Sequence, residues 1–139
     1  MTSPSATGWT TDPRSSPLLD LLGPVLVRPE PNGSLSVALV VEQRHCNNRG
    51  SLHGGVLTAL GDVALGRSAA MLTDPPTGLV TVSLEVHFAA AARPGNLVEV
   101  HTTTRRATRS MVFAQGEATV DETVIALLTA AFRRLAESH

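Results

Sequence analysis

The sequence lacks several features on which whole classes of protein depend. Lysine is absent, and the formal net charge of -1 argues against a nucleic-acid-binding protein, which would normally carry a basic excess. Cys46 is the only cysteine, which excludes an intrachain disulfide and a zinc site built from several cysteines. No apolar run is long enough to span a bilayer, and residues 1–16 lack the basic and apolar regions of a signal peptide. We therefore expect a cytoplasmic protein without a nucleic-acid or membrane partner.

The remaining composition is that of one globular domain. The chain has 139 residues, of which 42% are hydrophobic, and this is enough to form a real core. Residues 1–15 are rich in Ser, Thr, Pro and Gly and predict a flexible N-terminal arm, although Trp9 has the size to attach it to a surface. We expect residues 16–139 to form the single domain.

The order of the predicted elements indicates an α+β fold. Ser16 and Pro17 start a short helix that Gly23 ends, and one or two strands, clearest at residues 35–41, come next. An apolar run over residues 56–72 predicts one long helix. Four strands follow, at residues 81–88, 97–105, 111–120 and 123–135. Strands joined by short turns form an antiparallel meander, and the lone long helix must pack against it.

Alternation of side chains along the strands predicts which residues share a face. In the strand after the long helix, Val82, Leu84, Val86 and Phe88 fall on one face, and Thr81, Ser83, Glu85 and His87 fall on the other. The final strand is apolar on both faces, with Leu128 and Phe132 on one and Ile125 and Leu127 on the other. One helix cannot cover both faces of a sheet, so we expect a second subunit on the outer face.

A polar loop with glycines runs directly into the long helix. Gly54 and Gly55 stand at the helix entrance, where backbone N–H groups are free and the positive end of the helix dipole lies. Asp62 is the single acid of the apolar helix, and a carboxylate there costs stability unless it is paired, neutralised or used. A helix start that binds an electrophile, together with a buried acid, indicates acyl chemistry.

The loop resembles that of the phenylacetate-degradation type of acyl-CoA thioesterase. The family pattern N-x-x-G-x-x-H-G-G, with an acid nine residues after the His, is filled here by Asn47, Gly50, His53, Gly54, Gly55 and Asp62. The resemblance covers roughly residues 35–135 and implies a hotdog fold, in which an antiparallel sheet wraps around one long central helix. It implies hydrolysis of an aryl or medium-chain acyl-CoA, with no cofactor because coenzyme A is part of the substrate. Alanines at Ala89–Ala92 and Asn96 depart from the family pattern near the expected CoA entrance.

Each residue of the motif has an expected role. The N–H of Gly54 or Gly55 would hold the oxyanion, and Asp62 would be the nucleophile or general base. Pairing with Arg67 is the structural alternative for Asp62, but five residues of helix turn Arg67 about 140° away. Asn47 would hold the thioester or the water, or simply form a turn, and the resemblance favours the first role. His53 would fix the loop by hydrogen bonding.

Further contacts are implied for water and for CoA. Thr81 matches a family position near the attacking water, and Ser83 on the same strand is assigned to the substrate. Arginines at the later turns, which could converge at one end of the sheet, are candidates for the CoA phosphates; solvated turn charges are the alternative. This CoA group consists of Arg93, Arg106, Arg109 and Ser110, with Arg105 nearby. His45, His87 and His101 lack ligand spacing, so we expect no metal site.

The spacing of Gly54 and Asp62 predicts a site shared between subunits. Eight residues of helix separate them by about 12 Å, whereas a nucleophile must come within about 3–3.5 Å of the carbonyl. One chain could supply both groups only if the substrate lay along the helix. We therefore expect a homodimer with shared active sites, assembled further into a homotetramer. A hotdog dehydratase is disfavoured, because its catalytic His with a following Phe-Pro-Gly stretch is absent. A non-catalytic acyl-CoA-binding or regulatory module is the alternative, although it would gain little from Asp62.

Overall fold

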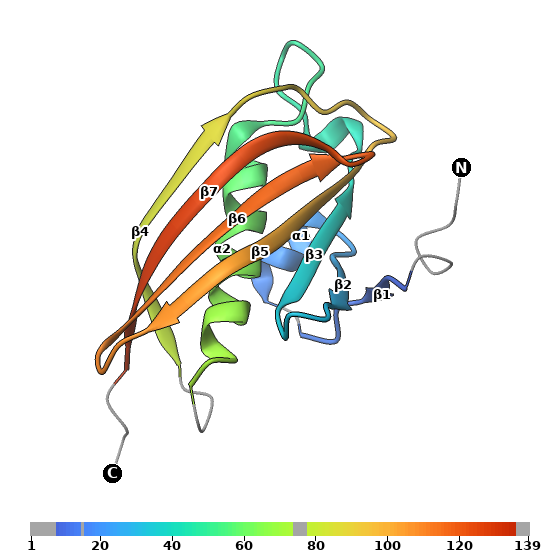
Figure 1. Ribbon diagram of the computed structural model, residues 1–139. Coiled ribbons are helices and arrows are strands. Elements are labelled where there is room, and N and C mark those ends of the chain that lie inside the picture. The colour runs from blue at the N-terminus through green and yellow to red at the C-terminus, as the bar shows by residue number, and fades with distance from the viewer. Residues whose placement is uncertain (1–7, 15, 74–77, 136–139) are drawn as a thin grey trace.

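The computed structural model describes residues 8–14, 16–73 and 78–135, and in them a curved antiparallel sheet wraps around one long helix (Figure 1). The helices are α1 (Pro17–Leu22) and α2 (Gly54–Ala70), with a short 3₁₀ helix at Gln43–His45. The strands are β1 (Thr10–Thr11), β2 (Leu26–Pro29), β3 (Leu35–Val40), β4 (Leu79–Phe88), β5 (Leu97–Ala107), β6 (Met111–Val120) and β7 (Thr123–Arg134). Their order in the sheet is β1-β2-β3-β5-β6-β7-β4. This is the α+β hotdog arrangement that the resemblance predicts.

The predicted elements are present with boundaries that differ by at most two residues. The Ser16 hydroxyl accepts a hydrogen bond from the Leu19 N–H at 3.3 Å and caps α1, while Gly23 leaves the helix with a φ of 92°. The long helix begins two residues earlier than the apolar run, at Gly54, because the glycines themselves form its first turn. No described helix is both long enough and apolar enough to cross a membrane.

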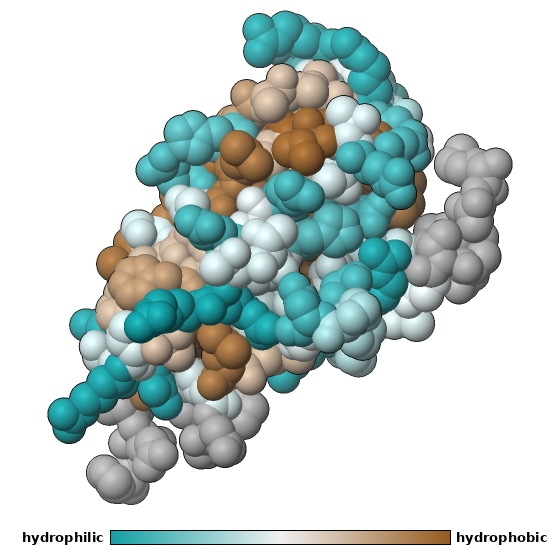
Figure 2. Space-filling model, viewed as in Figure 1, coloured by the Kyte–Doolittle hydropathy of each residue, from teal (hydrophilic) through white to brown (hydrophobic). Residues whose placement is uncertain are grey.

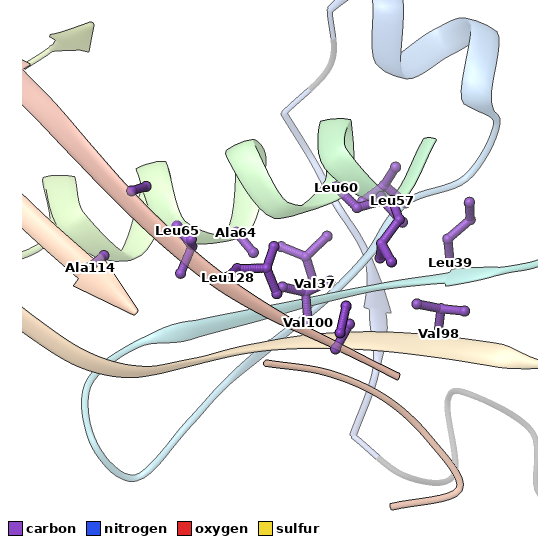
Figure 3. Packing of buried hydrophobic residues seen from close by; sticks show 14 of the residues in the cluster. Val37, Leu39, Leu57, Leu60, Ala64, Leu65, Val98, Val100, Ala114 and Leu128 are labelled. Atoms are coloured by element: carbon purple, nitrogen blue, oxygen red, sulfur yellow. The ribbon is translucent and has the colours of Figure 1, made fainter. Parts of the chain in front are cut away.

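The core lies between α2 and the concave face of the sheet (Figure 3). Leu60 and Leu65 of the helix and Val100 of β5 are fully buried there. The small residues of α2 and β6 permit this close packing. A Cβ at Gly61 would lie 2.3 Å from the Leu128 side chain, and larger residues would therefore push the helix off the sheet.

The segment before α1 is attached to the sheet, which differs from the flexible arm expected from its composition. Trp9 is only 2% exposed, and the Arg28 guanidinium lies 4.3 Å from its ring centroid. Residues Thr10–Thr11 pair with β2 as an edge strand, and Asp12 forms an ion pair with Arg67 of α2. Burial of one large aromatic side chain offsets the cost of ordering a short polar segment. Residues 1–7 and 15 lie outside the described residues.

A β-bulge in β4 corrects the face predicted for Thr81. In the register with β7, Thr81 lies opposite Phe132 and Ser83 lies opposite Ala131, so Val82 is an extra residue. An extra residue shifts the alternation of side chains by one position. Thr81 therefore points to the concave face that carries α2, whereas Ser83 stays on the outer face. Uninterrupted alternation, which placed both on the outer face, is wrong at Thr81.

Two surfaces of the sheet expose apolar side chains. The strand β4 is the last in the sheet order, and Val82 and Phe88 on it are 59% and 55% exposed. On the outer face, which the view of Figure 2 looks onto, Phe113 and Leu127 are 46% and 54% exposed among polar neighbours. The final strand is thus apolar on both faces as the sequence predicts, and no described segment covers the outer one.

Candidate active site

The hydroxyl of Thr81 donates a hydrogen bond to Oδ1 of Asp62 at 2.7 Å, which ties the acid of α2 to the start of β4. The bulge at Val82 makes this contact possible, because it turns Thr81 toward the helix. Asp62 is half-buried, and its second carboxylate oxygen has no hydrogen bond within the described part of the chain. The carboxylate is therefore oriented by one partner and keeps an oxygen for chemistry.

A cleft of about 430 Å³ opens beside Asp62. It is lined by Arg14, Asp62, Val63, Gly66, Arg67, Ala70, Gly78, Leu79, Thr81 and Phe132. The walls come from the C-terminal half of α2, the start of β4 and the end of β7, with one contribution from the segment before α1. Arg67 lies in this cleft but pairs with Asp12, so Asp62 is not held by a salt bridge to Arg67.

At the start of α2, one backbone N–H has no partner among the residues that the structure describes. Nδ1 of His53 accepts a hydrogen bond from the N–H of Gly55 at 2.8 Å, and the N–H of Val56 donates to the His53 carbonyl at 3.0 Å. Among the described residues nothing accepts from the N–H of Gly54. The Gly55 amide is thus occupied by the helix cap, and Gly54 is the residue that can hold an oxyanion. His53 fixes the loop through this cap.

Gly54 lies close to an aromatic ring. A Cβ at this position would lie 3.2 Å from the Phe88 ring, which stands at the far end of β4 from Thr81. Phe88 is 55% exposed, so the ring forms an open wall beside the free amide. The sequence alternation places Phe88 on this face, but nothing in the sequence indicates its contact with Gly54.

Asn47 organises the loop before the helix. Its Oδ1 accepts from the backbone N–H of Arg49 at 2.9 Å and from that of Ser51 at 3.3 Å, and its Nδ2 donates to the Ser51 hydroxyl at 3.2 Å. Gly50 follows the turn with a φ of 79°, a conformation that favours glycine. Asn47 therefore forms the turn, which is one of its two expected roles. One N–H of its side-chain amide has no partner in these bonds and could still donate to a ligand.

Within one chain the Asp62 carboxylate and the Gly54 amide lie far apart. Asp62 meets Thr81 near the beginning of β4, while Gly54 meets Phe88 at its end. The helix separates them by about 12 Å along its axis. A single chain therefore does not bring the Asp62 carboxylate and the free Gly54 amide together.

The arginines predicted to bind CoA do not converge within one chain, so this expectation is wrong for the protomer. Arg93 lies in the turn before β5, at the end of the sheet where α2 begins, and its N–H donates to the Asn96 side chain at 2.8 Å. Arg106 and Arg109 lie about the turn between β5 and β6, at the opposite end, because β5 runs the length of the sheet. The two turns follow one another in the sequence, but the long strand β5 between them holds them at opposite ends of the sheet.

The other members of the predicted CoA group also separate. Ser110 lies with Arg109 in the turn, where its carbonyl accepts from the N–H of Arg134 at 2.8 Å. Arg105 donates to the carbonyls of Ser68 and Asn32 at 2.9 and 2.8 Å, which gives it a structural role. Ser83 points to the outer face and away from the cleft. Sequence reasoning missed Arg14, because residues 1–15 carried no motif.

Comparisons with known proteins agree with this arrangement. Residues 49–126 match the model of the family described as "Thioesterase superfamily". The Pseudomonas aeruginosa protein named "Putative esterase PA0474" is 42% identical over 119 residues, which are 86% of this chain and 89% of that protein. A mutant structure of the phenylacetic acid degradation protein PaaI from Thermus thermophilus is 26% identical, covers 86% of this chain and all of that chain (100%), and superimposes with a TM-score of 0.76.

A further solved structure of the same fold contains CoA. The BH2602 protein from Bacillus halodurans, solved with CoA, superimposes with a TM-score of 0.80 over 91% of this chain and 83% of that chain. Its sequence is 18% identical, so this likeness shows the fold alone.

Proposed function

The chain belongs to the thioesterase superfamily and is a thioester hydrolase with a hotdog fold, and from this premise we propose that it cleaves an aryl or medium-chain acyl-CoA to the free acid and CoA. The observation that carries the residue assignment is the pairing of Asp62 with Thr81 in a cleft that is lined by both apolar side chains and arginines. A carboxylate held there by a neutral hydroxyl, with one oxygen free, is suited to act on a bound carbonyl.

The reaction follows from the Asp62 carboxylate and the free Gly54 amide. The thioester carbonyl oxygen accepts the N–H of Gly54, and the positive end of the α2 dipole stabilises the charge that develops on it. Asp62 either takes a proton from an attacking water or attacks the carbonyl itself. In the first case the water oxygen bonds to the carbonyl carbon, the carbon–sulfur bond breaks, and the proton on Asp62 passes to the CoA thiolate. In the second case an Asp62 oxygen bonds to the carbonyl carbon and the carbon–sulfur bond breaks. Water then hydrolyses the resulting mixed anhydride, which releases the acid and restores Asp62, and the CoA thiolate takes up a proton from that water. Thr81 keeps the carboxylate in place in both cases.

We assign the complete site to two subunits. A ten-residue edge strand with exposed apolar side chains, such as β4, is a natural surface for pairing with another sheet edge. Two β4 strands related by a twofold axis near Leu84 or Glu85 would pair antiparallel. The start of one strand then meets the end of the other. Asp62 with Thr81 would thereby face the partner's Gly54 with its Phe88.

The same pairing would bring the arginines that we propose for CoA binding close together across the two subunits. Arg93 lies at the end of the sheet that carries Gly54. Arg106 and Arg109 lie at the other end, near Asp62. At that end Val80 of β4 lies opposite Arg133 of β7. In the antiparallel dimer the partner's Arg93 would approach Arg106 and Arg109 of the first chain. Arginine suits phosphate groups because its planar guanidinium donates two parallel hydrogen bonds. Packing of dimers through the outer face, around Phe113 and Leu127, would give the homotetramer.

A panel of thioesters tests the activity. We expect the protein to release CoA, measured with a thiol reagent, from at least one aryl or medium-chain acyl-CoA. Protein without substrate is the control, since Cys46 is itself a thiol. Thermal stabilisation by acyl-CoAs without CoA release from any of them would contradict hydrolysis and indicate a binding module.

Replacement of Thr81 tests how Asp62 is held. In Thr81→Val the side chain keeps its shape and loses the hydroxyl, so we expect kcat to fall about tenfold, the effect of one hydrogen bond to a charged group. Thr81→Ser keeps the hydroxyl and should retain most of the wild-type kcat. Equal kcat values for the Val and Ser variants would show that the bond does not serve the reaction.

A further inference from the structure

The cleft runs from Asp62 along α2 toward the end of the helix, and its composition changes on the way. Next to the acid the walls are apolar or small, with Val63, Gly66, Leu79 and Phe132. Such walls suit the methylene groups of an acyl chain whose thioester carbonyl lies at Asp62. Two arginines, which an apolar acyl pocket does not need, line the same cleft.

One of these arginines is already neutralised. Arg67 pairs with Asp12, whose side chain is only 4% exposed, and this ion pair attaches the segment before α1 to the helix. The segment is held at two further points, by the buried ring of Trp9 and by the hydrogen bond from the Asp12 N–H to the Val25 carbonyl at 2.8 Å. The position of the next residues is therefore set by the fold.

The second arginine is Arg14. Its backbone N–H donates to Oδ1 of Asp12 at 2.9 Å, which forms a turn that holds Arg14 against the cleft. No side chain within residues 8–14, 16–73 and 78–135 forms an ion pair with its guanidinium. Since Asp12 is taken by Arg67, the cleft beyond Asp62 carries one uncompensated positive charge.

We propose that this cleft takes the acyl group of the substrate, and that Arg14 selects acyl groups that carry a carboxylate at their far end. The inference rests on the proposed hydrolysis and narrows its substrate class to ω-carboxyacyl thioesters. Arg14 and Arg67 line the same cleft and are both bound to Asp12. Arg67 lies about 7.5 Å along the helix from Asp62 at about 1.5 Å per residue, so we expect a short chain between the thioester and the carboxylate. A carboxylate in a half-enclosed cleft needs a partner, and a guanidinium can hold it with two hydrogen bonds.

The test compares thioesters that differ only at the far end. Adipyl-CoA and hexanoyl-CoA have acyl chains of equal length, one with and one without a terminal carboxylate. We expect the wild type to favour adipyl-CoA in kcat/KM, mostly through KM, and Arg14→Gln to reduce the adipyl/hexanoyl ratio roughly 10- to 100-fold, as one lost charged hydrogen-bonding partner predicts. Hexanoyl-CoA has no terminal carboxylate, so its kcat/KM should fall much less in this variant than that of adipyl-CoA. Arg14→Lys should restore part of the ratio.

Arg133→Gln is the matched control, because it removes one positive charge from an exposed position on β7 that does not line the cleft. It should leave the ratio at the wild-type value. An equal adipyl/hexanoyl ratio of kcat/KM in the wild type and in Arg14→Gln would overturn the inference. If hexanoyl-CoA is nevertheless hydrolysed in that case, the proposed function still holds. Failure of both thioesters, together with the rest of the acyl-CoA panel, would count against the proposed function and the inference alike.

Discussion

In an Asp62→Asn variant we expect kcat for acyl-CoA hydrolysis to fall roughly 10²- to 10⁴-fold, the usual contribution of a positioned acid or base. Asparagine has the shape of aspartate, and its carbonyl oxygen can still accept the Thr81 hydrogen bond, so the change removes the charge and little else. Binding of substrate should persist, because the apolar walls and the cationic residues are untouched. Steady-state thiol release at saturating substrate measures the effect.

Glu122→Gln provides the control for this experiment. Glu122 is exposed in the turn between β6 and β7, and its conversion removes the same unit of charge far from the cleft. Its kcat should equal that of the wild type, and both variants should unfold at the wild-type temperature. Full activity of Asp62→Asn would contradict the assignment of Asp62 as nucleophile or base.

The second large effect is expected at Gly54. Gly54→Pro removes the unpaired N–H that would hold the oxyanion, and loss of such a donor typically costs roughly 10²- to 10³-fold in kcat. The fold should tolerate the change. Proline is favoured at the first helical position, and His53 before it has the extended backbone that proline requires (φ −64°, ψ 133°). Circular dichroism and thermal unfolding check that the variant folds.

Gly54→Ala separates the two roles of the glycine. It keeps the N–H and adds a Cβ 3.2 Å from the flexible, half-exposed Phe88 ring, which can shift by a few tenths of an ångström. We therefore expect a much smaller loss of kcat for alanine than for proline. Equal losses would indicate that the space at residue 54 matters and the amide does not.

The order of elements and the presence of one acid on the apolar long helix could be predicted from the sequence, because both depend on local patterns. Caps and turn residues fix where α1 and the strands end, and Asp62 is conspicuous as the lone acid in an apolar helix. The face of Thr81 could not be read in this way. A bulge depends on how β4 aligns with β7, strands that are far apart in the chain, and the extra residue Val82 has no special composition.

The other differences between the sequence predictions and the structure come from contacts between residues that are far apart in the sequence. The composition of residues 8–14 is polar and turn-rich, but burial of the single Trp9 side chain outweighs that average. The positions of Arg93 and Arg109 depend on the length of β5, which carries them to opposite ends of the sheet. The Gly55 amide looked equivalent to that of Gly54 until the His53 cap distinguished them.

Mixing inactive subunits tests the central claim most directly. Asp62→Asn and Gly54→Pro chains, each inactive alone, are combined under conditions in which subunit exchange is verified by mass spectrometry of tagged chains. If a catalytic carboxylate works on a carbonyl held by the neighbouring subunit, about a quarter of wild-type activity returns, because about half of the dimers are mixed and each has one intact site. No recovered activity after confirmed exchange would contradict the account.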